Sequence, residues 1–445
     1  MRISTYIRAL LRNEKKFVLF LIGGYLLLTL LCFFILLLPF SRQQDVSLID
    51  HIFFSVSIVS TTGLAPGNFN ETYSFIGKLI SLFFIQLGGV GYMALCSFIL
   101  LRKHSYLPLI SKKLLNLEFS LPQKYPQVAF IYSVFVFTLL IEIIGAVFLY
   151  VGFKDAGVAN PLWNAVFHSV SAFCTAGFSL FNNSLVDFNT NSLITNTIVV
   201  LSLFGSIGFI VLSDFWLKLW RKRSKVTLTS KIILVATITF IIFPTLMMFV
   251  SDVNFFAQGS DGIELSFFQV VSAHTTVGFN TYDLSSLKST SVFILIIVMV
   301  IGASPAGTGG GIKTTSVTAL YAVLVAILKR QKRIRFLSKQ IPDTKIYLAV
   351  ASSIFYTVIL IVGVWIVLIF DGANFSLAQI VFECSSALST VGLSTGITPE
   401  LTPVSKIVIS FLMFIGRLGV LTFGLALVSK VPVLNNKIET EDIAV

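Results

Sequence analysis

Long and short apolar segments alternate along this chain in a fixed order, and that order limits the folds available to it. A helix needs roughly 20 residues to cross about 30 Å of hydrocarbon. Eight segments are long enough, near residues 17–40, 74–101, 128–152, 193–220, 230–250, 291–328, 346–370 and 404–429. Between the members of each pair lies a shorter apolar stretch, at 51–60, 161–174, 263–275 and 376–389. The order long, short, long therefore occurs four times.

Composition indicates that these segments lie in a membrane. Hydrophobic residues make up 56% of the chain and charged residues only 12%, whereas a soluble domain has about 25% charged residues. The first run, Phe17 to Phe40, is longer than the apolar region of a signal peptide and has no small-residue cleavage site. We therefore expect it to be a retained transmembrane helix. The cysteines lie in apolar segments without CxxC spacing, so disulfides and zinc sites are not expected.

The basic residues predict how the chain is oriented. Of 32 Lys and Arg, 25 lie at the N-terminus, in the loops near 102–124, 218–231 and 329–345, and in the C-terminal tail. The positive-inside rule then places both termini in the cytoplasm and lets every short segment enter from outside. The net charge of +12 is explained by topology and by contact with membrane lipid. It predicts no nucleic-acid partner.

The four short segments carry one repeated motif. Aligned on a glycine, they read VSTTGLA, FCTAGFS, HTTVGFN and LSTVGLS. A Thr stands two residues before the glycine, a Ser six before and a Phe ten before, every time. The Ser and Phe positions are Ser57, Ser171, Ser272 and Ser386, and Phe53, Phe167, Phe268 and Phe382. Chance agreement at all three positions is roughly a one-in-a-thousand event per added repeat. Duplication of an architecture without a binding site remains an alternative.

The spacing of the motif has a physical meaning. Phe, Ser and Thr at intervals of four lie along one face of a helix. The glycine permits φ > 0 and ends that helix with its carbonyls free. Such carbonyls are tolerated at membrane depth only around a polar cavity, and four helix C-termini around one axis favour a dehydrated cation. The candidate ion-binding residues are Thr61, Thr62, Gly63, Thr175, Ala176, Gly177, Thr276, Val277, Gly278, Thr390, Val391 and Gly392.

Four units of this kind resemble the Trk/Ktr/HKT superfamily of cation transporters over essentially the whole chain. The first apolar helix leads directly to the turn at Gly63, so the chain looks most like the membrane subunit of a bacterial Ktr-type potassium-uptake system. The resemblance implies an all-α membrane protein with eight transmembrane helices in four helix–pore-loop–helix repeats around a pseudo-fourfold pore. The expected repeats are 1–103, 104–223, 224–335, in which the second helix is interrupted, and 336–445, which includes a cytoplasmic tail.

The resemblance also implies the cargo and the partners. Glycine at all four filter positions favours K⁺, although a sodium-permeable or Na⁺-coupled transporter of the same fold is the alternative. A homodimer in the cell membrane and a separate cytosolic ring that binds nucleotides are implied in the same way. We expect K⁺ as the transported ion and no bound organic cofactor. A membrane enzyme is not expected, because the four His are scattered without HExxH spacing and no GxSxG occurs.

The third repeat departs from the others in its second helix. Residues 302–316 read GASPAGTGGGIKTTS, a composition through which no helix runs regularly. A phosphate-binding P-loop is not indicated, because Ile312 stands where that motif requires Gly. The resemblance implies a loop beneath the filter that obstructs the pore. The candidate gating residues are Ser304, Pro305, Ala306, Gly307, Thr308, Gly309, Gly310, Gly311, Ile312 and Lys313.

Charged and small residues in the membrane segments complete the predictions. Arg417 lies midway along the last apolar segment, where an ionised side chain marks a functional site by default. The resemblance implies that it faces the pore near the loop. Glu142 and Glu383 have no repeated counterpart, and helix packing or contact with a neighbouring polar group explains them. The second helices of the other repeats contain closely spaced glycines, which indicate either close packing or a hinge.

Overall fold

A computed structural model describes the protein over most of its length. The described residues are 2–104, 107, 109–119, 121, 126–219, 226–252, 255, 257–331, 333–337 and 339–427. The predicted C-terminal tail beyond Leu427 and parts of the basic loops lie outside them. The described part is helical apart from one short hairpin of β1 (Arg335–Phe336) and β2 (Lys339–Gln340).

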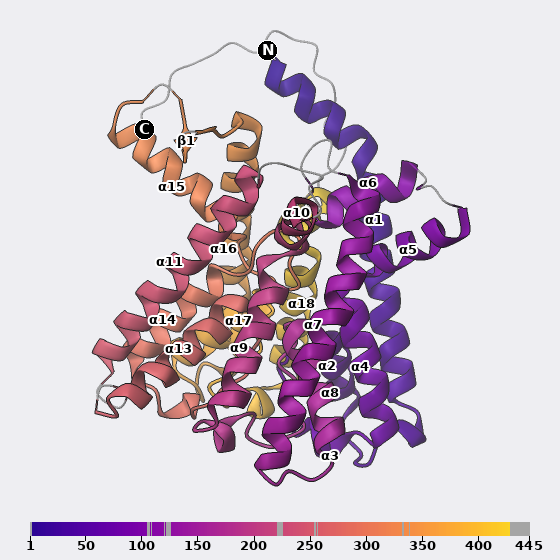
Figure 1. The fold of residues 1–445 in the computed structure, drawn as a ribbon, viewed down its shortest axis with the longest axis vertical. Helices are drawn as coiled ribbons and strands as arrows, with labels where there is room; N and C mark the ends of the chain where they lie inside the picture. The colour runs from indigo at the N-terminus through magenta and orange to yellow at the C-terminus, as the bar shows by residue number, and fades with distance from the viewer. Residues whose placement is uncertain are drawn as a thin grey trace.

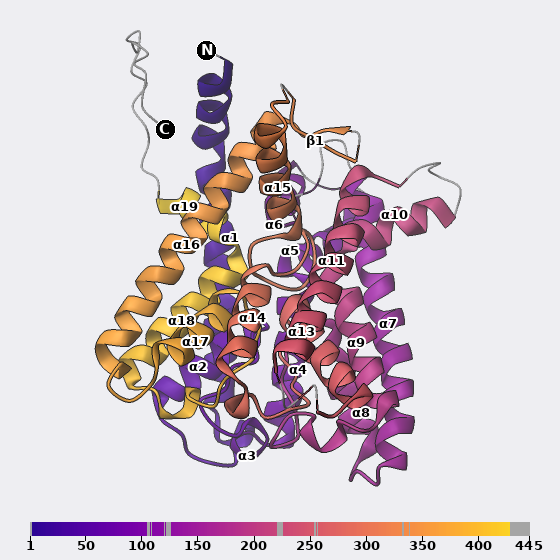
Figure 2. The same ribbon diagram turned by 90° about the vertical axis from the view of Figure 1, so that its left-hand side faces the viewer.

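Four long apolar helices are each able to cross a membrane on their own. They are α1 (Arg2–Leu36), α7 (Gln127–Asp155), α11 (Leu228–Ser251) and α16 (Asp343–Asp371). Each one coincides with the first long segment of a predicted repeat. In Figure 2, α16 lies beside α17 and α18, while α7 lies on the opposite side of the molecule. Many of their large apolar side chains are exposed, as expected for helices that face lipid.

Four short helices follow them, as the sequence predicts. They are α2 (Leu48–Val59), α8 (Pro161–Phe173), α13 (Ser260–Thr275) and α17 (Leu377–Leu388). Ser47 caps the start of α2, and Ser376 forms a capping box with Gln379 at the start of α17. All four lie in the lower half of Figure 1, at the end away from the β-hairpin. The repeated Phe on each helix is buried, at 0–4% exposure.

Three of the predicted second spans are bent pairs rather than single straight helices. The pairs are α4 (Phe75–Val90) with α5 (Tyr92–His104), α9 (Ser192–Ile207) with α10 (Phe209–Leu219), and α18 (Pro403–Leu418) with α19 (Val420–Leu427). They bend by 85°, 89° and 99°. The residues at the bends are Gly91, Gly208 and Gly419, whose φ angles of 88°, 94° and 85° disfavour any residue with a Cβ.

The remaining second span is divided by a loop, as predicted. Helices α14 (Ser289–Val300) and α15 (Thr314–Leu328) are separated by the non-helical residues 301–313. Over the described residues this leaves four straight candidate spans, or seven when each bent pair counts as one. The number of eight remains a prediction. The shorter elements are α3 (Phe69–Thr72), α6 (Leu109–Phe119), η1 (Pro39–Ser41), η2 (Val186–Phe188), η3 (Leu284–Ser286) and η4 (Thr398–Glu400).

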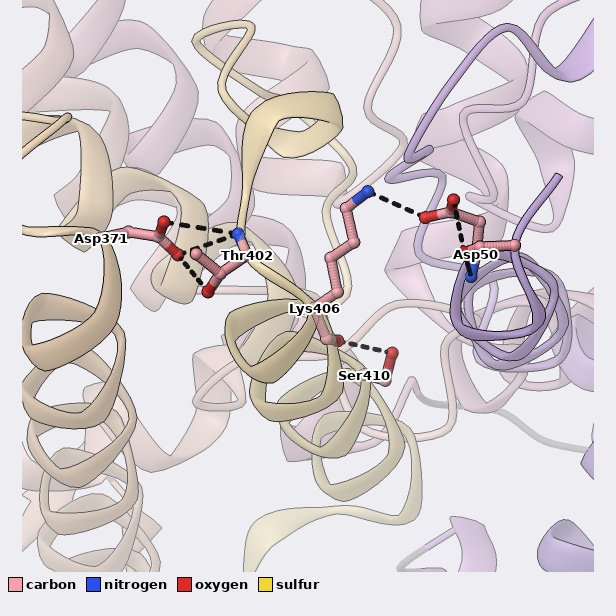
Figure 3. Close-up of polar contacts among 6 residues, drawn as sticks. Asp50, Asp371, Thr402, Lys406 and Ser410 are labelled. Carbon is pink, nitrogen blue, oxygen red and sulfur yellow. Dashed lines mark hydrogen bonds and ion pairs between the residues drawn. The ribbon is translucent and has the colours of Figure 1, made fainter.

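Polar contacts fix the end of α18 between α16 and α2 (Figure 3). The carboxylate of Asp371, the last residue of α16, accepts hydrogen bonds from the backbone N–H and hydroxyl of Thr402, at 3.1 and 2.9 Å. One turn further on, Lys406 Nζ lies 2.8 Å from Asp50 Oδ1 in the first turn of α2. The last predicted repeat is thereby bonded to the first.

Candidate functional site

The four Thr-x-Gly turns share one backbone conformation. The glycines have φ angles of 93°, 65°, 83° and 92°, so the prediction of positive φ is confirmed. The threonines have φ angles of 52°, 50°, 59° and 51°, which the sequence did not predict. A β-branched residue rarely adopts the left-handed region, because its Cβ lies too close to the backbone. The same strained conformation at four positions indicates a functional requirement rather than an accident of one loop.

The repeated serine holds each turn in place. The backbone N–H of the residue between Thr and Gly donates to the carbonyl oxygen of that serine, at 2.9, 2.8, 3.0 and 2.8 Å in chain order. The Ser57 and Ser386 hydroxyls accept from the N–H groups of Gly63 and Gly392, each at 3.1 Å. The other two serine hydroxyls donate instead to the carbonyls of Phe178 and Phe279. The repeated Ser is therefore part of the turn.

The four turns close into a ring. A β-carbon on Gly63 would lie 2.4 Å from the Ala176 carbonyl oxygen, and one on Gly177 would lie 2.4 Å from that of Val277. A β-carbon on Gly278 would lie 2.1 Å from the Val391 carbonyl oxygen. For Gly392 the neighbour is the carbonyl oxygen of Thr62, again at 2.1 Å, which returns to the first turn. Each turn thus touches the next in chain order, and only glycine fits at the four contacts.

The loop 301–313 lies directly against the threonines of this ring. The Thr308 hydroxyl accepts a hydrogen bond from that of Thr175 at 3.0 Å. A β-carbon on Gly309 would lie 2.1 Å from Thr276 Oγ1, and one on Gly310 would lie 2.6 Å from Thr390 Oγ1. Its glycines allow the backbone to approach the ring where any larger residue would clash.

The loop is bonded to α9 at the bend of that helix. The Thr308 N–H donates to the Gly205 carbonyl at 3.1 Å, and the Ser304 N–H donates to the Ser206 carbonyl at 3.1 Å. In return the Phe209 N–H donates to the Ala306 carbonyl at 2.9 Å. The break at Gly208 therefore frees backbone groups of α9 that the loop then satisfies.

Arg417 connects the loop, the first turn and α4. Its guanidinium donates to the backbone carbonyls of Thr308 and Gly88, and to that of Gly89 at 3.1 Å. It also donates to the Thr61 hydroxyl at 3.2 Å. Several donors on one planar group suit an array of carbonyl oxygens, so Nη1 and Nη2 are bonded without a carboxylate, whereas the buried Nε has no partner among the described residues. Arg417 thus completes the set of contacts beneath the four threonines.

A cavity of about 420 Å³ lies beyond the loop on the side away from the ring. Its lining includes Tyr25, Glu118, Lys313 and Arg417. Lys313 Nζ donates to the Gly309 carbonyl at 2.6 Å, and the Tyr25 hydroxyl donates to Glu118 Oε1 at 3.1 Å. Burial raises the pKa of the Glu118 carboxyl to about 7, although Tyr25 and Arg417 act in the opposite direction. The sequence interpretation did not single out Glu118, because it lies outside the repeated motifs and the apolar segments.

All the predicted site residues therefore gather in one region. The twelve predicted ion-binding residues form the ring, and the predicted gating residues lie beneath it. Glu142 accepts from Gln86 Nε2 at 3.3 Å and from Cys174 Sγ at 3.8 Å, directly before the ring residue Thr175. Within the described residues, no group of three or more His, Cys, Asp or Glu could hold a metal ion. The ring offers backbone carbonyl oxygens and hydroxyls instead.

Fold and site together define a helical membrane protein with a polar ring at its centre. The model of the TrkH family, described as a cation transport protein, matches residues 31–437. The chain therefore belongs to this family of cation transport proteins, and it is a membrane transporter rather than an enzyme.

Curated relatives and solved structures agree with this assignment. A Ktr system potassium uptake protein B of Bacillus subtilis (strain 168) is 31% identical over 408 residues, which cover 90% of each chain. A potassium/sodium uptake protein NtpJ of Enterococcus hirae is 29% identical over 439 residues and 96% of each chain. The crystal structure of the potassium transporter TrkH from Vibrio parahaemolyticus has a TM-score of 0.73, with 19% identity. It covers 94% of this chain and 86% of that one, and it supports the fold.

Proposed function

We propose that the chain conducts K⁺ across the cell membrane through the ring of four Thr-x-Gly turns. The observation that carries the proposal is the closed ring. Each glycine lies against a carbonyl oxygen of the next turn, and that oxygen belongs to the residue directly before the glycine of that turn. Carbonyl oxygens arranged in this way replace the hydration shell of a cation without a fixed negative charge. The C-terminal ends of α2, α8, α13 and α17 add partial negative charge toward the same point.

The loop 301–313 and Arg417 form the gate in this proposal. Thr308, Gly309 and Gly310 touch the threonines of the second, third and fourth turns, and Arg417 bonds to that of the first. An ion that leaves the ring would meet this plug and the guanidinium charge. Conduction therefore requires the loop to move away from the threonines, and its glycines allow such a change at low strain.

The surrounding architecture is proposed by the same reasoning. Four helix–pore-loop–helix repeats, with boundaries at 1–103, 104–223, 224–335 and 336–445, would provide eight membrane helices around the ring. Both termini would face the cytoplasm, because the basic loops gather on that side. The names of the Ktr relatives support a second subunit, and we propose a homodimer regulated by a cytosolic nucleotide-binding ring.

Sodium is the second candidate cargo. The relative from Enterococcus hirae is named a potassium/sodium uptake protein. Glycine at all four ring positions favours potassium, as the resemblance to the Trk/Ktr/HKT superfamily implies. Sodium coupling would add a second ion to the same pathway and would not change the ring.

Uptake measurements test the proposal directly. Cells that lack their own potassium uptake would express this chain with and without a candidate cytosolic subunit, and K⁺, Rb⁺ and Na⁺ uptake would be measured. We expect uptake of K⁺ and Rb⁺ in excess of Na⁺. Equal uptake of K⁺ and Na⁺ would favour the sodium-permeable alternative. The absence of any cation uptake by protein present in the membrane would contradict the proposal.

A further inference from the structure

One position of the short helices makes a recurring contact that their sequences do not reveal. Nine residues before each ring glycine stand Phe54, His168, Gln269 and Glu383. All four side chains are fully buried. The residue types differ, so the position escapes a search for repeated letters. The prediction that Glu383 has no repeated counterpart holds for its residue type but not for its position, and its contact with a neighbouring polar group was expected.

Three of these side chains bond, directly or through one hydroxyl, to the outgoing strand. By this name we mean the irregular, non-β segment that follows each ring glycine. His168 Nδ1 lies 2.8 Å from the Asn164 carbonyl, which can only accept, so Nε2 is the acceptor nitrogen. Nε2 lies 3.0 Å from the Ser179 hydroxyl and 3.4 Å from the Leu180 N–H. Ser179 and Leu180 lie two and three residues after Gly177. The imidazole thus bridges its helix to the outgoing strand.

Gln269 makes the equivalent bridge in the third turn. Glu383 makes an indirect one in the fourth, through Thr398, the first residue of η4, to Ser394, two residues after Gly392. In the amide orientation that satisfies both of its groups, the Gln269 oxygen accepts from the Thr281 N–H at 2.8 Å. Glu383 Oε1 accepts from the Thr398 hydroxyl, which in turn lies 3.0 Å from that of Ser394. Glu383 Oε2 is buried and has no hydrogen-bond partner among the described residues.

The first turn uses packing in place of a hydrogen bond. Phe54 contacts the ring of Tyr73 edge to face, with 5.3 Å between centroids. The outgoing strands consist of irregular backbone, which has no regular ladder of hydrogen bonds to stiffen it. A ring of oxygens that discriminates by the size of the cation does so through its spacing, which must then be maintained. Side chains that bind the outgoing strands can supply that stiffness.

We propose that His168, Gln269 and Glu383 are positioning residues. They hold the outgoing strands that follow the turns and thereby set the ion selectivity of the ring. They act through the turns, since each is two helical turns away from the nearest ring threonine along its helix. The inference rests on the proposed function, because it assigns these residues to the same ring. Glu383 is the most informative of the three, because burying a carboxyl group at 0% exposure costs free energy unless hydrogen bonds compensate for it.

A comparison of two substitutions tests the role of Glu383. Glu383→Leu removes the acceptor while filling the space, and Glu383→Gln keeps an acceptor oxygen like that of Gln269. One lost hydrogen bond corresponds to about a five- to tenfold change in an equilibrium. We therefore expect Glu383→Leu to lower the ratio of Rb⁺ to Na⁺ uptake about five- to tenfold, and Glu383→Gln to change it less than about twofold.

The control is Asp371→Asn in the same predicted repeat. Asp371 is also a buried carboxylate and also bonds to the segment before α18, but its partner is Thr402 (Figure 3). Because Thr402 lies beyond the outgoing strand, Asp371→Asn should lower stability and leave the uptake ratio unchanged. The amount of each variant in the membrane is measured alongside.

Each outcome of the comparison is decisive. If the wild-type chain takes up no cation, the proposed function fails whatever the variants do. If the wild type is selective and Glu383→Leu keeps its ratio at normal abundance, the inference is overturned. An equal loss in Glu383→Gln and Glu383→Leu would also overturn the hydrogen-bonding role. Should Glu383→Leu not reach the membrane, Gln269→Leu is judged by the same ratio, because it removes the corresponding bridge at a residue that has no titratable group.

Discussion

Single residues in this molecule hold backbone conformations that are unfavourable on their own. The ring threonines keep φ angles of 50–59°, although each such residue costs about 1 kcal/mol or more. The hydrogen bonds from the turn to the repeated serine offset this cost. The result is a turn in which two residues, the threonine and the glycine two positions later, have positive φ angles, and a regular helix end has no such pair. The strain is thus confined to the ring.

The ring glycines should be the residues most sensitive to a small substitution. Gly392→Ser would place a β-carbon 2.1 Å from the Thr62 carbonyl oxygen at a φ of 92°. We expect K⁺ over Na⁺ discrimination to weaken, since the displaced carbonyl no longer matches the ion. Gly278→Ser, with 2.1 Å to the Val391 carbonyl, should behave alike. Competition of Na⁺ with Rb⁺ uptake measures the effect.

Gly157→Ser is the matched control for these variants. Gly157 also has a positive φ, of 71°, but no atom lies within 4 Å of a β-carbon built there. It should therefore suffer the backbone strain of about 1–2 kcal/mol without a change in selectivity. Unaltered Na⁺ competition in Gly→Ser variants at all four ring positions would remove the ring from the conduction pathway.

Arg417 should restrain the loop as well as repel ions. Arg417→Ala removes both the charge and the bonds to Thr308 and Thr61, so we expect higher ion flux and weaker dependence on a cytosolic partner. Arg417→Lys keeps the charge but cannot reach several carbonyls at once. Uptake by the two variants separates the roles, because only a pure barrier would leave Arg417→Lys like the wild type. Loss of assembly in Arg417→Ala would indicate a structural residue instead.

Glu118 should make the flux depend on pH. With a pKa of about 7, its carboxyl is neutral below that pH and negatively charged above it. The titratable groups around it are Tyr25 on α1, and Tyr92 and Cys96 on α5, all neutral in this range, and the charged Arg417 on α18. A negative charge in the cavity attracts cations, so we expect uptake to rise between pH 6 and 8, a range of about one unit either side of that pKa. In Glu118→Gln this rise should disappear, and an unchanged pH profile would contradict the role.

The sequence predicts whole helices and loops where a single periodicity or composition is enough to determine the structure. The long helices, the short helices and the interruption at 301–313 were all predictable, because apolar length and glycine content set them. The right-angle bends at Gly91, Gly208 and Gly419 were not, since closely spaced glycines serve packing and hinges equally well. The partners of Arg417 and the bridge at Glu383 were also beyond prediction. They depend on backbone atoms that approach only in the folded molecule.

Shortening the loop should open the pathway. Deleting residues between Gly307 and Gly311 removes the backbone that touches the ring threonines, and we expect ion flux to rise and regulation to weaken. Gly310→Ala is a milder alternative, because its methyl group would lie 2.5 Å from the Ser389 carbonyl and push the loop away. Uptake rates normalised to membrane abundance measure both.

Gly67→Ala is the control for this element. Gly67 is exposed and lies outside the loop 301–313, and no atom lies within 4 Å of a β-carbon built there. Uptake should therefore not change. A shortened protein that folds and reaches the membrane, yet shows normal flux and normal regulation, would be incompatible with a gate at this position.

At the scale of the whole molecule, a ring made by one chain must close between its last and first segments. Nothing in the covalent chain holds that junction, because α2 and α18 are separated by most of the sequence. The structure supplies the contact between Gly392 and Thr62, the bonds from Arg417 to Gly88 and Thr61, and the ion pair of Lys406 with Asp50. The junction is therefore bonded at several levels along α18, from its first turn to the ring.

The ion pair at this junction should contribute measurably to stability. Lys406 and Asp50 lie 2.8 Å apart with side chains only 11% and 19% exposed, so removing one partner leaves a poorly hydrated charge. We expect Lys406→Met to lower the free energy of unfolding by about 1–3 kcal/mol. The loss is detected as a lower midpoint of thermal unfolding of the purified protein in detergent. The double variant with Asp50→Asn should recover part of the loss, because it removes the unpaired charge.

Arg42→Met is the control: it breaks an exposed ion pair with Asp45 inside the first predicted repeat, at 2.9 Å, and should leave the midpoint unchanged. Equal midpoints for Lys406→Met and Arg42→Met would show that this ion pair does not stabilise the closure of the ring.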